Sequence, residues 1–429
     1  MKMGSSKDGQ APVVLLGVGL PGLDVARSLG RRGVEVIGVD WRAGWVSRSR
    51  YLTRTLCPAS ESEEELRRVL DRLAGELPGR PLLMPLHDDY VLFLSRHREA
   101  LGRHYRFLMP DPGLIEALVS KRGLWSVCQD TGVPLPATHF PGSAGDLPAL
   151  AARLTYPCII KPSLSSDWDR TRPPMVEGPQ KVVEVHSPAQ LLEMKPLLAG
   201  EYGEVVIQEV IPGPDSNLYY LAAYFDRRGE PLASFVGRKL RTAPPHFGAG
   251  TYVESVCAPE VARLGLGLLK QLGYKGCGGV EFKLDPRDGL FKLIEINARF
   301  GLWDGFAAAC GLDIARLAYA DAVGLPLPSC DGYRAGRRWV QLDRDFWAAL
   351  QYKRDGQITL ARWLASLLRC RVFAPAALDD PMPWFALNLV FGRTLLGSAG
   401  RRVLTALARG RRAPPGTAAC ACESQAQQP

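Results

Sequence analysis

The chain has 429 residues, of which 46% are hydrophobic and 23% charged, and it has a formal net charge of +9. These values are typical of an ordinary soluble protein with two or three domains. The arginines are spread without a basic run interleaved with aromatics, so nucleic acid is not an expected partner. No apolar stretch approaches the roughly 18 residues of a membrane span. The ten cysteines form no CxxC pair and no signal peptide is present, so we expect reduced thiols and a cytoplasmic location.

The first part of the chain has the pattern of a βαβ unit. An apolar run at 12–16 predicts a buried parallel strand, and a GxGxxG motif beginning at Gly17 leads into a helix. A second strand at 34–39 ends at Asp40, the usual place of a ribose-binding acid. An NAD-dependent oxidoreductase is therefore one hypothesis, although Pro21 removes an N–H that could hold phosphate.

A charged amphipathic helix at 60–77 and a buried strand at 82–86 follow. The triplet His87-Asp88-Asp89 comes directly after this strand, at the edge where open α/β sheets place ligands. An acid here is expected either to contact an amine substrate or to cap the helix that starts at Tyr90.

Two lysines stand out in the next part of the chain. Lys121 lies in a predicted helix at 114–130, which precedes the segment GVPLP at 132–136. Lys161 lies at the end of a short apolar strand at 156–162. Taken alone, each of these lysines would be expected in a solvated position.

A further strand and a basic segment come next. The sequence VVIQEVI at 205–211 predicts a strand, which ends at a Pro-Gly pair. After a predicted hairpin at 218–236, Lys239 and Arg241 lie two residues apart and are predicted to share a strand face. Neighbouring cations can bind polyphosphate and an acidic substrate, and a solvated basic loop is the alternative.

The segment 278–300 predicts a β-hairpin around the turn 285–289. Glu295, Asn297 and Arg299 lie two residues apart, so they share a face while the strand stays extended. Carboxylate and amide oxygens are ligands that Mg²⁺ prefers. A solvated strand face with scattered charge is the alternative.

The length of the turn decides whether Glu281 joins these residues. A five-residue turn pairs Leu284 with Leu290 and Glu281 with Leu293, which puts Glu281 on the face of Glu295. The opposite face would then be an apolar set: Val280, Phe282, Leu284, Leu290, Ile294 and Ile296. This pattern favours the five-residue turn.

Glu281 followed by Glu295-x-Asn297-x-Arg299 resembles the metal-binding end of the ATP-grasp superfamily, in its carboxylate–amine ligase branch. The upstream order of Lys121, Lys161 and the QEVI strand is similar to the same family. The resemblance covers about 12–328 and implies an α/β and α+β fold: a Rossmann-like N-terminal domain (1–110), an ATP-grasp domain of two α+β subdomains (111–328), and a mostly helical C-terminal extension with a disordered tail (329–429).

The resemblance also implies roles for individual residues. Glu281, Glu295 and Asn297 would hold Mg²⁺ or Mn²⁺, and Arg299 would stabilise the transferring phosphoryl group or an oxyanion. Lys239 and Arg241 would complete the catalytic set. ATP would be bound by the following residues: Lys121, Lys161, Gln208, Glu209, Val210, Ile211 and Asn217. The stretch 163–180 would take the place of a glycine-rich flap, with Arg170 or Arg172 replacing some of its backbone donors.

The implied reaction activates a small-molecule carboxylate as an acyl phosphate, which an amine attacks, with release of ADP and phosphate. The last hundred residues predict helices at 339–352 and 359–368 and a basic amphipathic helix at 387–407. That last helix would pack on the core, lie on an anionic membrane or contact a partner. A non-catalytic nucleotide-binding scaffold or membrane-surface protein is therefore a third hypothesis.

Overall fold

The computed structural model describes residues 10–164, 167–168, 171–174, 176, 182–198, 200 and 202–394. It divides into two compact units, Met1–Trp384 and Phe385–Pro429. The described residues of the second unit, 385–394, are helical. Within the described ranges no helix combines the length and apolarity needed to cross a bilayer.

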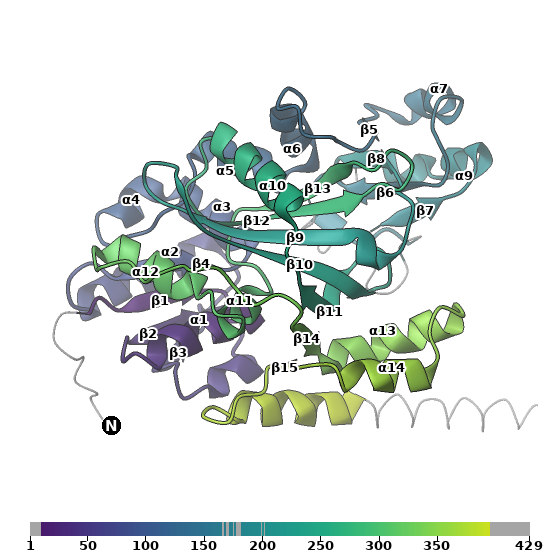
Figure 1. Ribbon diagram of the computed structural model, residues 1–429. Coiled ribbons are helices and arrows are strands. Elements are labelled where there is room, and N and C mark those ends of the chain that lie inside the picture. Colours follow the sequence, from purple (N-terminus) through teal and green to yellow (C-terminus); the bar gives the residue numbers. More distant parts are fainter. Residues whose placement is uncertain are drawn as a thin grey trace, which may run out of the picture. The chain divides into compact units, whose positions relative to one another are not determined.

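The first sheet is parallel throughout and has the strand order β3-β2-β1-β4 (Figure 1). Its strands are β1 (Val13–Leu16), β2 (Val36–Val39), β3 (Arg54–Leu56) and β4 (Leu82–Pro85). The helices of this part are α1 (Leu20–Gly30), η1 (Trp45–Arg48), α2 (Glu63–Glu76), α3 (Asp88–Arg96) and α4 (Arg98–Gly102). β1 and β2 are buried along their whole length, as expected when both faces of a parallel sheet are covered.

The central sheet has seven strands in the order β13-β12-β9-β10-β11-β14-β15. Neighbouring strands are antiparallel, except that β14 and β15 are parallel. The strands are β9 (Leu218–Phe225), β10 (Pro231–Ala243), β11 (Ala249–Ser255), β12 (Gly276–Leu284), β13 (Phe291–Asn297), β14 (Arg338–Gln341) and β15 (Val372–Ala374). The predicted hairpins at 218–236 and 278–300 are therefore both present.

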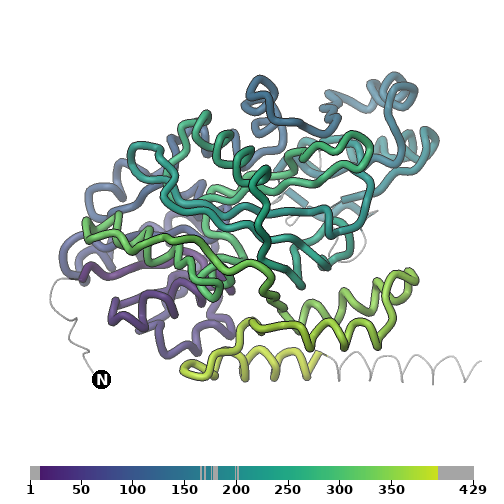
Figure 2. The backbone as a smooth tube through the Cα atoms, viewed as in Figure 1, coloured from purple at the N-terminus to yellow at the C-terminus, as the bar shows by residue number. Residues whose placement is uncertain are grey.

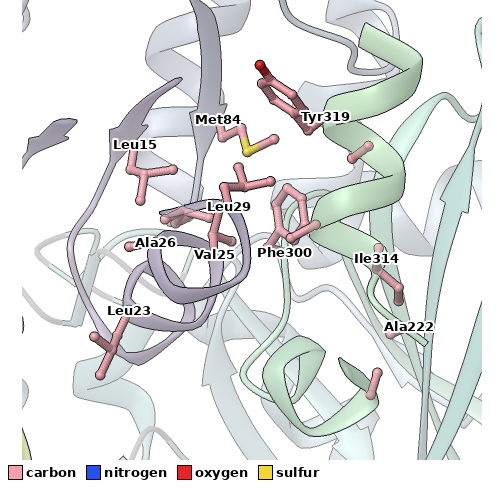
Figure 3. Packing of buried hydrophobic residues seen from close by; sticks show 14 of the residues in the cluster. Leu15, Leu23, Val25, Ala26, Leu29, Met84, Ala222, Phe300, Ile314 and Tyr319 are labelled. Carbon is pink, nitrogen blue, oxygen red and sulfur yellow. The ribbon is translucent and has the colours of Figure 1, made fainter. Parts of the chain in front are cut away.

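Alternation along β9 gives the central sheet two apolar faces. Ala222 packs with α1, α11 (Asp304–Ala309) and α12 (Ile314–Val323), whereas Leu221 packs with α10 (Pro259–Gln271). Figure 3 shows part of the first of these clusters, where Val25 and Leu29 of α1 lie beside Phe300, on the side of α1 that faces α12 with Ile314 and Tyr319. In Figure 2 the green trace of α12 lies beside the purple trace of β1 and α1, which it also contacts. The N-terminal sheet thus shares a core with the central sheet.

A smaller antiparallel sheet has the order β5-β8-β6-β7. Its strands are β5 (Thr138–His139), β6 (Cys158–Pro162), β7 (Val183–Val185) and β8 (Val205–Glu209). Its helices are η2 (Ala144–Asp146), α7 (Leu147–Ala151), α9 (Pro188–Glu193) and η3 (Lys195–Leu198), which contribute Leu147, Leu150 and Leu191 to its core.

The helix predicted at 114–130 is in fact two helices. α5 (Pro112–Val119) ends at Ser120, whose backbone is extended. The Ser120 side chain then caps α6 (Lys121–Cys128) by accepting a hydrogen bond from the Gly123 N–H at 2.8 Å. Serine competes with a helix interior and favours a cap, which explains the break. As a result Lys121 lies in the first turn of α6.

The C-terminal extension is less helical than predicted. The segment predicted as a helix at 339–352 begins as β14, and α13 (Leu342–Arg354) follows it, then α14 (Leu360–Leu367). Trp339 and Val340 enter two different apolar clusters, so the pattern there has the period of a strand. Further on, Asp380 accepts a hydrogen bond at 3.0 Å from Nε of the buried Arg27, which ties this segment to α1.

Candidate active site

The two predicted metal-binding acids lie side by side in the central sheet. Glu281 in β12 is paired directly with Glu295 in β13. The predicted register is wrong, because Leu284 pairs with Phe291 and not with Leu290. A bulge at Ile294, which leaves no partner between the pairs Phe282–Leu293 and Glu281–Glu295, then brings the acids opposite each other. The predicted shared face is therefore present through a different register.

The bulge also changes the apolar face of the hairpin. Leu290 is 45% exposed and Ile294 is only partly buried, so these two members of the predicted apolar set are not in the core. Phe291 and Leu293 take their places beside Val280 in the core under α10. The turn has six residues and not the predicted five, and only the bulge restores the face of Glu295.

Two lysines neutralise the acid pair. Lys239 Nζ donates to Glu281 Oε2 at 2.6 Å, and Lys121 Nζ lies 3.8 Å from Glu295 Oε2. Burial and the nearby Glu295 charge raise the pKa of Glu281, although Lys239 opposes this shift. Burial acts in the same direction on Glu295, but Lys121, Arg299 and a hydrogen bond from Asn297 outweigh it and lower the pKa of Glu295 to about 2.

Lys161 lies close by in β6, and no carboxylate among the described residues pairs with it. Its Nζ donates to Gln208 Oε1 at 2.8 Å, and Gln208 in turn donates to Thr138 Oγ1 at 2.9 Å. Burial, followed by repulsion from Lys121, lowers the pKa of Lys161 to about 7. An anion beside this buried amine would favour its protonated, charged form.

Three of these predicted ATP-binding residues, Lys121, Lys161 and Gln208, line a cavity of about 20 Å³. Trp125 and Ile294 are also in its wall. A cavity of this size holds one or two water molecules, so the entry of a nucleotide base requires side-chain movement.

The other predicted adenine and ribose contacts are engaged within the protein. The Glu209 carboxylate accepts hydrogen bonds from Ala137 N at 2.9 Å and Arg287 Nη2 at 2.8 Å. The Val210 N–H donates to the Pro157 carbonyl at 3.2 Å. The side chain of Ile211 is buried, and the Asn217 amide donates to the Leu284 carbonyl at 3.2 Å.

Arg299 is held by an acid from the N-terminal sheet. Its Nε donates to Asp88 Oδ1 at 2.7 Å and its Nη2 to Asp88 Oδ2 at 3.3 Å. The predicted acid cap of a helix from Tyr90 is wrong, because the helix starts at Asp88 and is capped by His87, which accepts from Asp89 N at 3.4 Å. Asp88 is thus the member of the triplet that reaches the candidate site.

Arg241 does not belong to this site, contrary to the predicted shared face with Lys239. A second irregularity at Leu240 pairs Lys239 with Val253 and Arg241 with Tyr252, and these two partners lie on opposite faces of β11. Arg241 instead forms a buried bidentate salt bridge with Asp345 of α13: Nε donates to Oδ1 at 2.9 Å and Nη2 donates to Oδ2 at 2.7 Å.

Sequence reasoning missed Tyr220 at the back of the site. It pairs with Glu281 across β9 and β12, and its buried hydroxyl has no hydrogen-bond partner among the described residues. A Cβ at Gly279 would lie 1.8 Å from this hydroxyl, and one at Gly301 would lie 2.2 Å from it. The absence of side chains at these two glycines is the sequence signal for the close approach.

Two further acids were also missed. Asp304 accepts from Gly301 N at 2.7 Å, and the carboxylate of Asp24 in α1 lies against Gly305. Burial raises the pKa of each to about 7, and Arg299 partly opposes this shift at Asp304. No motif marks them, because they come together only where α1 meets α11.

The glycine motif after β1 and the acid at the end of β2 are both occupied by contacts within the protein. The Asp40 carboxylate accepts from Val18 N, from Trp41 N at 2.8 Å and from the Tyr90 hydroxyl at 3.1 Å. The ring of Tyr90 lies 3.1 Å from the position of a Cβ at Gly17. Because the Asp40 carboxylate is already engaged by these three donors, it is not available to bind a ribose. This arrangement argues against the NAD hypothesis.

Some predictions fall outside the described residues. Much of the proposed flap at 163–180 is among them, including Arg170, and so is most of the basic helix predicted at 387–407. Arg172 lies in a short described stretch, 171–174, with residues outside the described ranges on both sides of it.

Two comparisons of the sequence with known proteins point to ATP-binding proteins and ligases. A family model described as "Carbamoyl-phosphate synthase L chain, ATP binding domain" matches residues 259–330, which include both acids. The D-aspartate ligase of Enterococcus faecium (strain Aus0004) is 28% identical over 274 residues, which are 61% of this chain and 63% of that protein. The chain therefore spans less than two thirds of this curated relative.

Two solved structures share the fold. The L-amino acid ligase from Bacillus licheniformis has a TM-score of 0.59 and 19% identity, covering 77% of this chain and 79% of that one. The ADP complex of N5-carboxyaminoimidazole ribonucleotide synthetase has a TM-score of 0.59 and 14% identity, covering 76% and 81%.

The fold and its neighbours define a mixed α/β protein of the ATP-grasp type. The family model, the D-aspartate ligase and the solved structures all point to the ATP-grasp superfamily and its carboxylate–amine ligases, as the sequence motifs predicted. The bound ADP named for one neighbour agrees with the predicted nucleotide.

Proposed function

We propose that this chain is an ATP- and Mg²⁺-dependent ligase that activates a carboxylate as an acyl phosphate and joins it to an amine, with release of ADP and phosphate. The observation that supports this most directly is the pairing of Glu281 with Glu295 on one sheet face, with Lys121, Lys161 and Lys239 around them. Mn²⁺ would be an alternative metal.

The donor set fits a metal that is shared with a substrate. Glu281, Glu295 and Asn297 offer hard oxygen ligands, and within the described ranges no group of three or more His, Cys, Asp or Glu forms an all-protein metal cage. Mg²⁺ is usually held by one or two carboxylates together with phosphate oxygens. When bound, it would neutralise charge on the transferring phosphates.

The lysines divide the remaining work. Lys161 has no carboxylate partner in the part of the chain that the structure describes, and it would hold phosphate together with Lys121, which is 17% exposed. Lys239 is almost fully buried against Glu281 and would fix the orientation of that carboxylate. Removal of any of these cations would leave paired acids or phosphates less neutralised.

Arg299 would stabilise the phosphoryl group in transfer or the oxyanion that follows amine attack. Its two bonds to Asp88 hold the guanidinium plane in a fixed direction, with N–H donors still available for an oxyanion. The reaction needs no covalent side-chain nucleophile.

The amine would enter beside Asp24 and Asp304. These carboxyls lie where α1 meets α11, and Asp304 lies within electrostatic range of Arg299. A carboxyl whose pKa lies near neutrality can accept a proton from an ammonium group and leave a nucleophilic amine. The names of the D-aspartate ligase and the L-amino acid ligase suggest amino acids as the first substrates to test.

We further propose the three-part organisation predicted from the sequence: a Rossmann-like domain (1–110), the ATP-grasp domain (111–328) and a C-terminal extension (329–429). The separate, fully parallel sheet of β1 to β4 supports the first boundary. A contact of the last segment with an anionic membrane or a partner stays a prediction. Liposome flotation of a chain ending at residue 394 tests it without removing any described residue, and unchanged flotation would refute it.

The decisive experiment is ADP release screened over pairs of amino acids and other small carboxylates and amines. Glu295→Gln keeps the side-chain shape but removes a metal-binding charge, so it should abolish release while the melting temperature stays near that of the wild type. Glu230→Gln, which removes only an exposed pair with Lys270, is the matched control and should keep full release. Release near the wild-type level in Glu295→Gln would refute the metal role.

A further inference from the structure

A second cavity, of about 440 Å³, shares no lining residue with the candidate active site. Its wall contains four arginines: Arg80, Arg98, Arg106 and Arg227. Tyr105, Phe107 and Leu108 supply an apolar part of the wall. None of these residues has a role in the proposed ligase reaction.

The four guanidinium groups come from separate segments. Arg80 precedes β4, Arg98 starts α4, and Arg106 follows α4 in a segment that bridges to Leu82 beside β4. Arg227 lies in the turn between β9 and β10 of the central sheet. The cavity thus lies where the N-terminal sheet and the central sheet meet.

Backbone carbonyls are the main partners of these arginines. Arg80 donates to the Tyr105 carbonyl at 3.0 Å, and both Arg106 and Arg227 donate to the Ala322 carbonyl, at 3.5 and 3.3 Å. Each guanidinium has five N–H donors, so most of these donors remain available.

Carboxylates do not balance this charge. Across the described part of the chain, one carboxylate lies within 4 Å of the four guanidiniums, that of Asp111, at 3.9 Å from Arg98. The acids in the turn of Arg227 are engaged elsewhere: Asp226 accepts from two backbone N–H groups of its own turn, and Glu230 pairs with Lys270. Four cations against one acid leave a surplus of three positive charges around one cavity.

We propose that this cavity binds a small molecule carrying a diphosphate group, at a site separate from the nucleotide site. Guanidinium forks bind phosphate oxygens in pairs, and a diphosphate offers enough oxygens to engage several forks at once. The volume is within the range of small-molecule pockets and exceeds the need of a single inorganic phosphate. The side chains of Phe107 and Leu108 would receive the uncharged part of the ligand.

Calorimetry with pyrophosphate on the full chain tests the proposal. Arg106→Gln/Arg227→Gln should weaken pyrophosphate binding at least tenfold. Arg228→Gln is the matched control, because Arg228 lies in the same turn but does not line the cavity, and it should bind like the wild type. Lys161→Gln removes a cation of the candidate active site and should retain this binding.

Three outcomes would overturn the proposal. Loss of binding in Lys161→Gln with retention in the arginine variant would place pyrophosphate in the active site alone. Equal binding of citrate would refute selectivity for phosphate. Equal pyrophosphate binding by Arg106→Gln/Arg227→Gln and the wild type would show that this cavity is not the binding site.

A measurement on the unliganded protein separates binding from folding. Arginines gathered around an empty cavity repel one another, so Arg80→Gln, at an exposed position, should melt at the same temperature as the wild type or higher. In the wild type, pyrophosphate should raise the melting temperature, and in Arg80→Gln this rise should be smaller. A lower melting temperature of unliganded Arg80→Gln together with an undiminished rise would refute the binding role.

Discussion

Binding of a nucleotide should change the charge of Lys161. Burial and the neighbouring Lys121 lower its pKa to about 7 in the free protein. A lysine with this pKa is about 10% protonated at pH 8 and about 90% protonated at pH 6. A phosphate within hydrogen-bond distance should return the pKa to about 10, so binding should take up about 0.9 proton at pH 8 and about 0.1 at pH 6.

Calorimetric titration with MgADP in several buffers measures this uptake, because the observed heat changes with the ionisation enthalpy of the buffer in proportion to the protons exchanged. Lys161→Gln is the control: it keeps a hydrogen-bonding side chain beside Gln208, and the protonation of the nucleotide itself is common to both proteins. The difference between the two slopes at pH 8 should be about 0.9 proton. Equal slopes at pH 8 would refute the placement of Lys161 against the phosphates.

Three further predictions concern residues around the candidate site. Arg241→Met leaves Asp345 as a buried unpaired charge and should lower the free energy of unfolding in urea by about 3–5 kcal/mol, with ADP release per folded molecule unchanged; lost release at full stability would contradict this. Tyr220→Phe removes a buried hydroxyl that has no partner among the described residues, so its free energy of unfolding should equal that of the wild type or exceed it by about 1 kcal/mol; a clear loss would reveal a partner. Burial raises the pKa of Asp304 to about 7 in the folded protein, so the folded state retains a proton that the unfolded state loses near pH 4. Its contribution to stability should therefore be complete below pH 4 and decline toward pH 7, and Asp304→Asn should reduce this decline; an identical pH profile would argue against the shift.

The sequence predicted the residues of the acid pair but not the way in which they meet. The alternation of apolar residues along the two strands is a local signal, and it favoured a five-residue turn. The bulge at Ile294 depends on tertiary contacts: the Leu293 N–H leaves the hairpin and donates to the Pro134 carbonyl at 2.8 Å. A contact with a residue so far upstream cannot be read from the alternation of two strands.

The error at Arg241 has the same physical origin. Residues two apart share a face only in a regular strand, and the bulge beside Leu240 breaks that rule. The partner of Arg241 is Asp345, in a helix that carries no recognisable catalytic motif. Composition shows that a buried arginine needs an acid but does not show which acid supplies it.

Helix α3 connects the N-terminal sheet to the candidate site. Its first residue, Asp88, holds Arg299, which lies two residues beyond the end of β13 and so outside the strand predicted to carry it. Two residues later, the ring of Tyr90 lies against Gly17 and its hydroxyl donates to Asp40. Gly17 has a φ of +92°, and a side chain there would meet the ring. The first glycine of the motif, Gly17, is therefore accounted for by close packing under Tyr90, and this packing fixes the helix whose first turn orients Arg299.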